Sequence, residues 1–141
     1  MIIKQLSIFL ENKSGRLTDV TEALAVANIN IIAFSIADTT DYGILRLILN
    51  KPEEAEKVLR EKDFSVHITE VIGLVVPHEP SGLHRALKIL SSEGISIEYM
   101  YAFALSNRAT VVIRTDAIQQ TIAALERHKM ELIKTSDIYE I

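Results

Sequence analysis

The chain repeats its own pattern 66 positions later, and this repeat limits the possible folds more than any other feature. Asn12-Lys13-Ser14-Gly15-Arg16-Leu17 precedes one helical pattern, and His78-Glu79-Pro80-Ser81-Gly82-Leu83 precedes another. The same offset also relates Leu24 to Leu90, Ile29 to Ile95, Ile31 to Ile97, Leu59 to Leu125 and Asn28 to Gly94. Asparagine and glycine are the residues that best tolerate the left-handed backbone at a helix end. The repeat therefore predicts two copies of one supersecondary unit.

Each copy is predicted to run strand, helix, strand, strand, helix, strand. In the first copy, apolar periodicity and turn residues give strands at 3–10, 30–37, 44–49 and 65–69, with helices at 15–27 and from Pro52 onward. In the second copy they give strands at 70–76, 96–104, 109–114 and 131–139, with helices at 82–93 and 116–127. Asp116 and Gln119 are expected to form a capping box at the start of the last helix.

This order of elements predicts an α+β fold made of two ferredoxin-like βαββαβ units, residues 1–69 and residues 70–141. Each unit should have an antiparallel sheet of order 4-1-3-2 with both helices on one face. The second strand of each unit, at 31–37 and 97–103, is apolar on both faces. A strand of that kind is covered on both faces, so we expect contact between units and a homodimer.

The helix-start loops and the strand openings resemble those of the ACT domain family over essentially the whole chain, twice. The family pattern has a loop ending Pro-Gly-x-Leu and a second strand opening with Gly-x-Asn-Ile. The loops here are Ser14-Gly15-Arg16-Leu17 and Pro80-Ser81-Gly82-Leu83, and the strand openings are Asn28-Ile29-Asn30-Ile31 and Gly94-Ile95-Ser96-Ile97. The first loop lacks the proline, and the second has serine in place of the first glycine.

The resemblance implies a regulatory protein that binds a free amino acid where units meet. In that family the ligand lies between the first loop of one unit and the second-strand opening of a neighbour. Carried over residue by residue, the implied ligand-binding residues are Asn12, Ser14, Gly15, Arg16, Leu17 and Asn30 in the first repeat, and His78, Ser81, Gly82, Leu83 and Ser96 in the second. Many members of the family regulate a metabolic enzyme, which makes such an enzyme an expected partner.

The chemistry of an amino acid fits these positions. The start of a helix offers unpaired N–H groups and a positive dipole end to a carboxylate. Small residues let the ligand approach the backbone, and asparagine offers an acceptor to the ammonium and a donor to the carboxylate. The simpler interpretation is that Asn12 and Ser14 only cap the helix.

Two other functions remain open. The first is an interaction module whose loops bind no ligand. The second is an enzyme on the same fold, such as an acylphosphatase, but that chemistry needs an arginine-bearing phosphate loop, which Arg16 alone does not make.

Composition argues against several other classes. The net charge is −4 and no basic cluster surrounds Tyr99, Tyr101 and Phe103, so nucleic acid is not an expected partner. The absence of cysteine excludes thiol chemistry and cysteine-bound zinc. His67, His78, His84 and His128 have no metal-binding spacing, so we expect no metal and no cofactor. Neither a signal peptide nor a membrane span is evident, and we expect a cytoplasmic protein.

Overall fold

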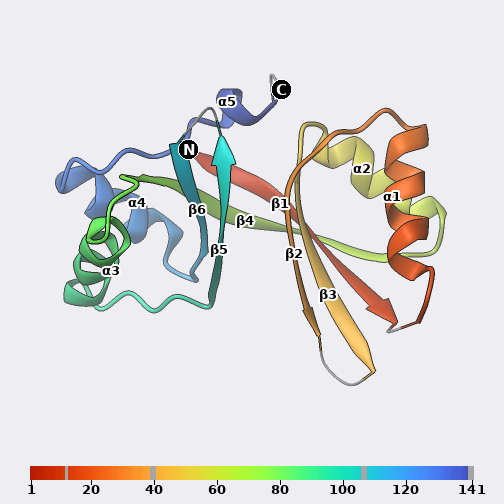
Figure 1. The fold of residues 1–141 in the computed structure, drawn as a ribbon, viewed down its shortest axis with the longest axis horizontal. Helices are drawn as coiled ribbons and strands as arrows, with labels where there is room; N and C mark the ends of the chain where they lie inside the picture. Colours follow the sequence, from red (N-terminus) through yellow and green to blue (C-terminus); the bar gives the residue numbers. More distant parts are fainter. Residues whose placement is uncertain (12, 39–40, 106–107, 140–141) are drawn as a thin grey trace. The chain divides into compact units, whose positions relative to one another are not determined.

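The computed structural model describes residues 1–11, 13–38, 41–105 and 108–139. It contains six strands and five helices (Figure 1). The strands are β1 (Ile2–Glu11), β2 (Ile31–Asp38), β3 (Tyr42–Leu49), β4 (Ser65–Val76), β5 (Tyr99–Leu105) and β6 (Arg108–Arg114). The helices are α1 (Arg16–Val26), α2 (Pro52–Glu61), α3 (Gly82–Ser92), α4 (Ile118–Arg127) and α5 (Thr135–Tyr139). The predicted α+β class with ferredoxin-like units is confirmed.

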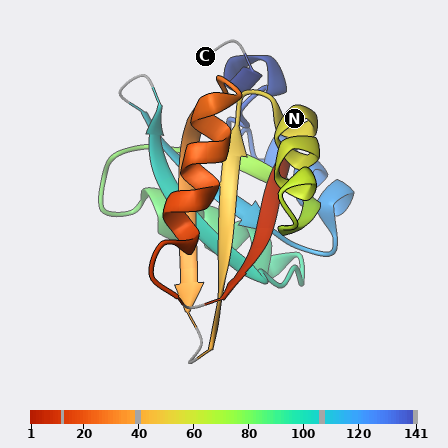
Figure 2. The same ribbon diagram turned by 90° about the vertical axis from the view of Figure 1, so that its right-hand side faces the viewer.

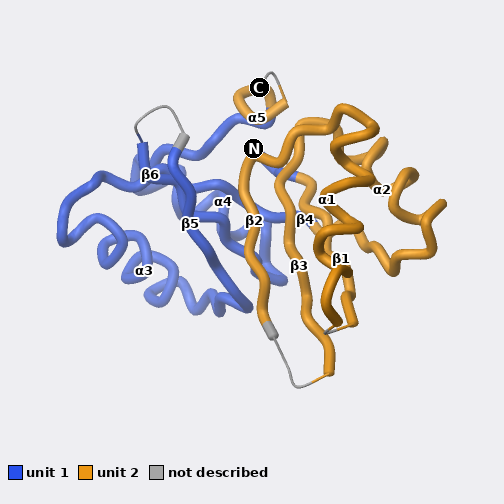
Figure 3. The backbone as a smooth tube through the Cα atoms, turned by 45° about the vertical axis from the view of Figure 1, so that its right-hand side comes forward, with its two compact units in different colours: residues 1–3, 70–135 blue, residues 4–69, 136–141 orange. Residues whose placement is uncertain are grey.

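The chain forms two compact units (Figure 3). The first-repeat unit contains Lys4–Thr69 and Ser136–Ile141, and the second-repeat unit contains Met1–Ile3 and Glu70–Thr135. Strand β4 runs through the boundary at residues 69 and 70, where the sequence predicted two separate strands. The division into domains 1–69 and 70–141 stays a prediction.

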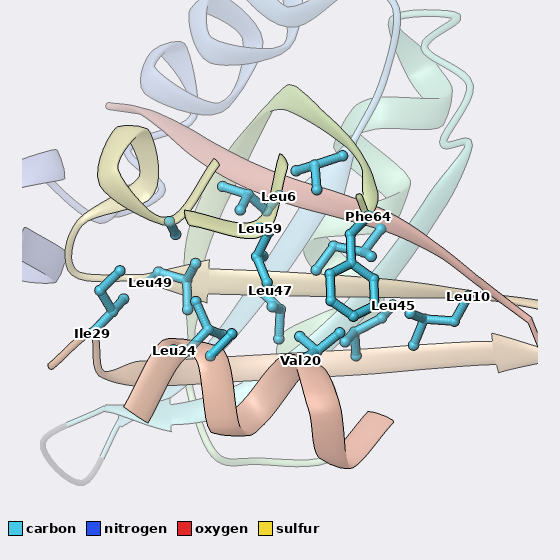
Figure 4. Packing of buried hydrophobic residues seen from close by; sticks show 14 residues of the cluster. Leu6, Leu10, Val20, Leu24, Ile29, Leu45, Leu47, Leu49, Leu59 and Phe64 are labelled. Atoms are coloured by element: carbon cyan, nitrogen blue, oxygen red, sulfur yellow. The ribbon is translucent and has the colours of Figure 1, made fainter. Parts of the chain in front are cut away.

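In the first-repeat unit, hydrogen bonds order the strands β2-β3-β1-β4, which is the predicted 4-1-3-2 order. Leu6 of β1 and Phe34 of β2 both pair with Leu47 of the central strand β3. Helices α1 and α2 lie on one face of this sheet (Figure 2). Their apolar side chains enclose one core with the strands, with Leu24 and Leu59 packed over Leu47 (Figure 4).

The second-repeat unit has the strand order β4-β6-β5. Leu74 of β4 pairs with Val111 of β6, which pairs in turn with Ala102 of β5. Its core is made of buried side chains from β4, β6, α3 and α4, among them Leu74, Leu90, Val111 and Leu125. Leu90 and Leu125 occupy the repeat positions of Leu24 and Leu59, so both cores are built from the same positions of the repeat.

Helices α1 to α4 end in the same way. One residue adopts a left-handed backbone after each helix, namely Asn28 (φ 57°), Asp63 (φ 65°), Gly94 (φ 70°) and Lys129 (φ 59°). The N–H of the next residue then bonds a carbonyl five residues back, in the pairs Ile29–Leu24, Phe64–Leu59, Ile95–Leu90 and Met130–Leu125. This is the Schellman motif. Asn28 and Gly94 were predicted as helix stops from the repeat.

The predicted strand at 131–139 is wrong. Only Leu132 bridges to β4, at Leu74, and residues Thr135–Tyr139 form the helix α5. The Thr135 hydroxyl donates a hydrogen bond to the Ile2 carbonyl at 3.0 Å and accepts one from the Met1 ammonium at 3.2 Å. These bonds hold Thr135 beside the N-terminal residues of the chain. The backbone pairing with β4 therefore does not continue beyond one bridge.

The predicted capping box at Asp116 is also wrong. Helix α4 begins at Ile118, and its N-cap residue Ala117 makes no side-chain capping bond. The Thr115 hydroxyl instead accepts a hydrogen bond from the Ala117 N–H at 3.2 Å, and the Thr121 hydroxyl donates to the Ala117 carbonyl at 2.8 Å. Two threonines therefore organise the turn for which Asp116 and Gln119 were expected.

Truncating the equivalent leucines should destabilise both repeats. Leu24 and Leu90 are each 1% exposed, and a buried Leu→Ala change costs about 2–5 kcal/mol. We expect Leu24→Ala and Leu90→Ala each to lower the free energy of unfolding by that amount in urea denaturation. Val26→Ala is the control, because Val26 is 83% exposed and its truncation should change stability by less than about 0.5 kcal/mol.

Candidate ligand-binding loops

The loop between β1 and α1 is open to solvent. Lys13, Ser14 and Gly15 are exposed, and Gly15 has a left-handed backbone with φ 91°. Apart from its chain neighbours and the backbone of α1, no atom of the described residues lies within 4 Å of the place where a Cβ of Gly15 would stand. Glycine is therefore needed here for its backbone angle and not for lack of space among the described residues. Asn12, a predicted ligand contact, lies outside the described residues.

The first turn of α1 carries two N–H groups without an acceptor among the described residues. The Arg16 N–H bonds the Lys13 carbonyl at 3.3 Å, and the Asp19 N–H bonds the Gly15 carbonyl at 2.9 Å. Between them, the N–H groups of Leu17 and Thr18 have no such bond in this part of the chain. Free N–H groups at a helix start attract an anion such as a carboxylate.

The loop between β4 and α3 repeats this bonding at the matching positions. The Gly82 N–H bonds the Glu79 carbonyl at 3.1 Å, and the Arg85 N–H bonds the Ser81 carbonyl at 3.1 Å. The N–H groups of Leu83 and His84 again lack an acceptor within the described ranges. The two helix starts thus offer the same pair of donors.

Gly82 is fixed by sterics rather than by its backbone angle. A Cβ at this position would lie far inside van der Waals contact with the Pro77 carbonyl oxygen. Ser81, its neighbour, makes no capping hydrogen bond. At α1 the N-cap is Gly15, without a side-chain capping bond, so Ser14 does not cap this helix, while the same interpretation of Asn12 lies outside the described residues. Ser81 and Ser14 are exposed, so both stay available to a ligand.

The charged groups of the first loop are held by neighbouring side chains. Lys13 pairs with Glu11 at 2.9 Å, and this hydrogen bond, followed by the charge of Lys13, lowers the pKa of Glu11 below its ordinary value. The Arg16 guanidinium lies over the Phe64 ring at 4.6 Å from its centroid and 3.6 Å from the Asp19 carboxylate. Arg16 therefore lines a groove of about 370 Å³ along α1, with Asp19, Glu22 and Lys62.

The predicted strand-opening residues lie at the other end of each unit's sheet. Asn30 lies beside the end of β3, where its N–H bonds the Asn50 side-chain oxygen at 3.0 Å. The loop residues follow Glu11, which pairs with Tyr42 at the start of β3. Helix α1 separates the two places by 11 residues, or about 16 Å. In the second-repeat unit, Ser96 precedes β5 while His78 lies near its end, beside Phe103 and Ala104.

The exposed Asn30 lines a polar groove of about 410 Å³ with Asn28, Asn50 and Lys51. Its side-chain amide has no partner among the described residues. The Lys51 ammonium donates to the Asn28 carbonyl at 3.4 Å. This groove offers amide donors, amide acceptors and one cation.

Sequence reasoning missed the basic residues near His78. Arg85, Arg108 and Lys129 line a groove of about 370 Å³ with His78. They come from the first turn of α3, the start of β6 and the end of α4, so no sequence spacing could have grouped them. Only the fold brings them together.

Two further features are absent from the described residues. No group of three or more His, Cys, Asp or Glu side chains in this part of the chain could hold a metal ion. None of the helices described is long and apolar enough to cross a membrane.

The chain is similar to a known protein family and to solved structures. A family model for the ACT domain pair matches residues 1–141. None of the curated proteins searched matches the chain significantly. A crystal structure of a protein from Bacteroides thetaiotaomicron is 50% identical, with a TM-score of 0.94 over 100% of this chain and 98% of that one.

Two more distant structures share the fold. The ligand-free regulatory subunit of aspartate kinase from Thermus thermophilus is 16% identical, with a TM-score of 0.64 over 88% of this chain and 91% of that one. The regulatory subunit of aspartate kinase from Thermus flavus is 18% identical, with a TM-score of 0.57 over 90% and 94%.

Adding one methyl group at Gly82 should disrupt the second loop. Because the new Cβ would overlap the Pro77 carbonyl, we expect Gly82→Ala to lower the free energy of unfolding by about 1–3 kcal/mol. Ser81→Ala is the matched control, since the Ser81 hydroxyl makes no capping bond. Equal melting temperatures for Gly82→Ala and Ser81→Ala would show that the loop is not packed as described.

Proposed function

The chain belongs to the ACT domain family, as an ACT domain pair, and on this premise we propose that it is a non-catalytic regulatory protein that binds a free amino acid. The amino acid binds where the helix-start loop of one unit meets the second-strand opening of a neighbouring unit. The family match over residues 1–141 carries the proposal. The local chemistry at both halves of the site supports it.

The helix-start loops supply the carboxylate half of the site. The N–H groups of Leu17 and Thr18, which have no acceptor among the described residues, lie in the first turn of α1, next to the exposed Gly15. A carboxylate placed there gains charge-assisted hydrogen bonds and the positive end of the helix dipole. Leu83 and His84 offer the same donors in the second repeat.

The strand openings supply the second half of the site. Asn30 presents an exposed amide, whose oxygen suits the ligand ammonium, in the groove that it shares with Asn50 and Lys51. Ser96 is the shorter equivalent in the second repeat and is also exposed. Because each loop lies at the far end of α1 or α3 from its own strand opening, the two halves of a site come from different units.

A second copy of the chain is the proposed source of some of these contacts. Phe34 and Ile36 of β2 are 66% and 47% exposed, and Met100 of β5 is 40% exposed. Apolar side chains on end strands favour pairing between like surfaces in a two-fold dimer. The same observation favours the alternative function, an interaction module whose loops bind no ligand.

The regulated partner is proposed to be a metabolic enzyme. The aspartate kinase subunits that share the fold are regulatory by name. An amino acid bridging two units would stabilise one arrangement of them, and an enzyme in contact with that arrangement would respond to the ligand.

A thermal-shift screen of the twenty amino acids tests ligand binding. A ligand that binds only the folded protein stabilises it by about 2.7 kcal/mol at 100 times its Kd, so one or a few amino acids should raise the melting temperature. An interaction module without a ligand would give no shift with any of them.

The residues are tested with the amino acid that the screen finds. Asn30→Ala removes a hydrogen bond to a charged group, which is worth about 1.5–3 kcal/mol, or about 10- to 150-fold in Kd. Calorimetry should show this loss, with the unliganded melting temperature nearly unchanged. Gln119→Ala, on the exposed face of α4, is the control. If Asn30→Ala and Asn12→Ala both bind like the parent protein, the ligand lies elsewhere.

Light scattering tests the dimer. We expect a dimer at micromolar concentration and a shift to monomer in Phe34→Lys, because the lysine places a charge in an apolar interface. Val26→Lys is the control, since Val26 is also exposed but lies on α1. A monomeric parent protein would contradict the dimer.

A further inference from the structure

A basic groove lies within the second-repeat unit and shares one residue, His78, with the proposed amino-acid site. We define it by its ten lining residues: Val75, Val76, Pro77, His78, Arg85, Arg108, Ala109, Lys129, Met130 and Glu131. Its volume is about 370 Å³. No strand opening contributes to it, and all its residues belong to one unit.

The groove is positive although the chain is negative. Arg85, Arg108 and Lys129 line it with a single carboxylate, Glu131, while the chain as a whole has a net charge of −4. Arg108 pairs with Glu131, and Arg85 pairs with Glu79 at 2.5 Å. Lys129 has no ion-pair partner among the described residues. A guanidinium has five donors, so both arginines keep donors for another anion.

Lys129 occupies a position that disfavours lysine. Its φ is 59°, and the left-handed region costs about 1–2 kcal/mol for residues other than glycine, asparagine and aspartate. The other three helix ends of this type use Asn28, Asp63 and Gly94, which tolerate that backbone. Of the four helix ends, the one with the least suitable residue is therefore the one that lines the groove.

The first-repeat unit lacks this arrangement. Asp19 stands at the repeat position of Arg85, and Asp63 stands at that of Lys129. The charge is thus reversed at both positions while the helix-end backbone is the same. The basic groove is a property of the second repeat alone, which argues for a role of its side chains and against a requirement of the fold.

The apolar residues of the groove bear on the class of ligand. Four apolar residues, Val75, Val76, Ala109 and Met130, also line the groove, and we call them its apolar floor. Guanidinium groups bind carboxylates in a bidentate manner, and an apolar floor suits a short methylene chain. We propose that the basic groove binds a small dicarboxylate, with its carboxylates on the arginines and Lys129 and its methylene carbons on the floor.

Calorimetry and NMR titration with succinate and glutarate test this proposal on the full chain. Butyrate is the matched control ligand, because it has the carbon chain of succinate and only one carboxylate. We expect the dicarboxylates to bind at least about 10-fold more tightly than butyrate, since one charge-assisted contact is lost. Shifts of the Met130 methyl and His78 ring signals should accompany binding.

The variant that separates binding from stability is Lys129→Asn. Asparagine tolerates the left-handed backbone, so the unliganded protein should melt at an equal or higher temperature, while dicarboxylate affinity falls about 10-fold or more. Lys88→Gln on the exposed part of α3 removes the same charge outside the groove and should leave affinity unchanged. If both variants lost the same dicarboxylate affinity, the loss would follow from the change in net charge alone, and the proposal would be overturned.

Three further results would overturn it. They are no binding of succinate or glutarate at millimolar concentration, equal binding of butyrate, and equal binding of inorganic phosphate, which has no use for the apolar floor. Asn30→Ala distinguishes this inference from the proposed function, because it should weaken amino-acid binding and leave dicarboxylate binding intact.

Discussion

The left-handed residue that ends each of the helices α1 to α4 is the constraint on which the rest of the structure depends. It reverses the chain so that the next residue returns to the core while its N–H satisfies a carbonyl of the last turn. Ile29, Phe64 and Ile95, the residues placed in this way, are 6%, 6% and 8% exposed. One backbone device therefore ends the helix, satisfies its polar groups and anchors the start of the next segment.

The same device fixes which groups can form a site. Because α1 runs antiparallel to β1 and the chain turns back at Asn28, the loop at Gly15 and the opening at Asn30 stand at opposite ends of one unit. No side chain can span a helix of 11 residues, so one ligand cannot touch both places within a unit. If both places bind one amino acid, they must belong to neighbouring units. The affinity for the ligand then depends on how these units are arranged.

The repeat made most of the fold predictable, because the same residue pattern occurs twice and each copy supports the prediction for the other. The helix stops at Asn28 and Gly94 and the order of strands in the first-repeat unit followed from residue types. The stop at Lys129 did not, since lysine carries no signal for a left-handed backbone. The end of the second repeat failed for another reason: Thr135 bonds Ile2, a contact over 133 positions that no local pattern contains. At the candidate sites, the loops were predictable from glycine and serine, whereas the grouping of Arg85, Arg108 and Lys129 required the fold.

The two repeats thus keep one backbone and differ in surface charge. Hydrogen bonds at the helix starts and helix ends match position by position, because the same backbone geometry is used in both units. The side chains differ, since Arg85 and Lys129 of the second repeat stand at the positions of Asp19 and Asp63 in the first. The backbone donors shared by both repeats suit one ligand chemistry, while the side chains of the second repeat suit a further anion site. The proposed anion binding then explains the backbone strain at Lys129. The strain is tolerated because the rest of the fold fixes the geometry of this helix end.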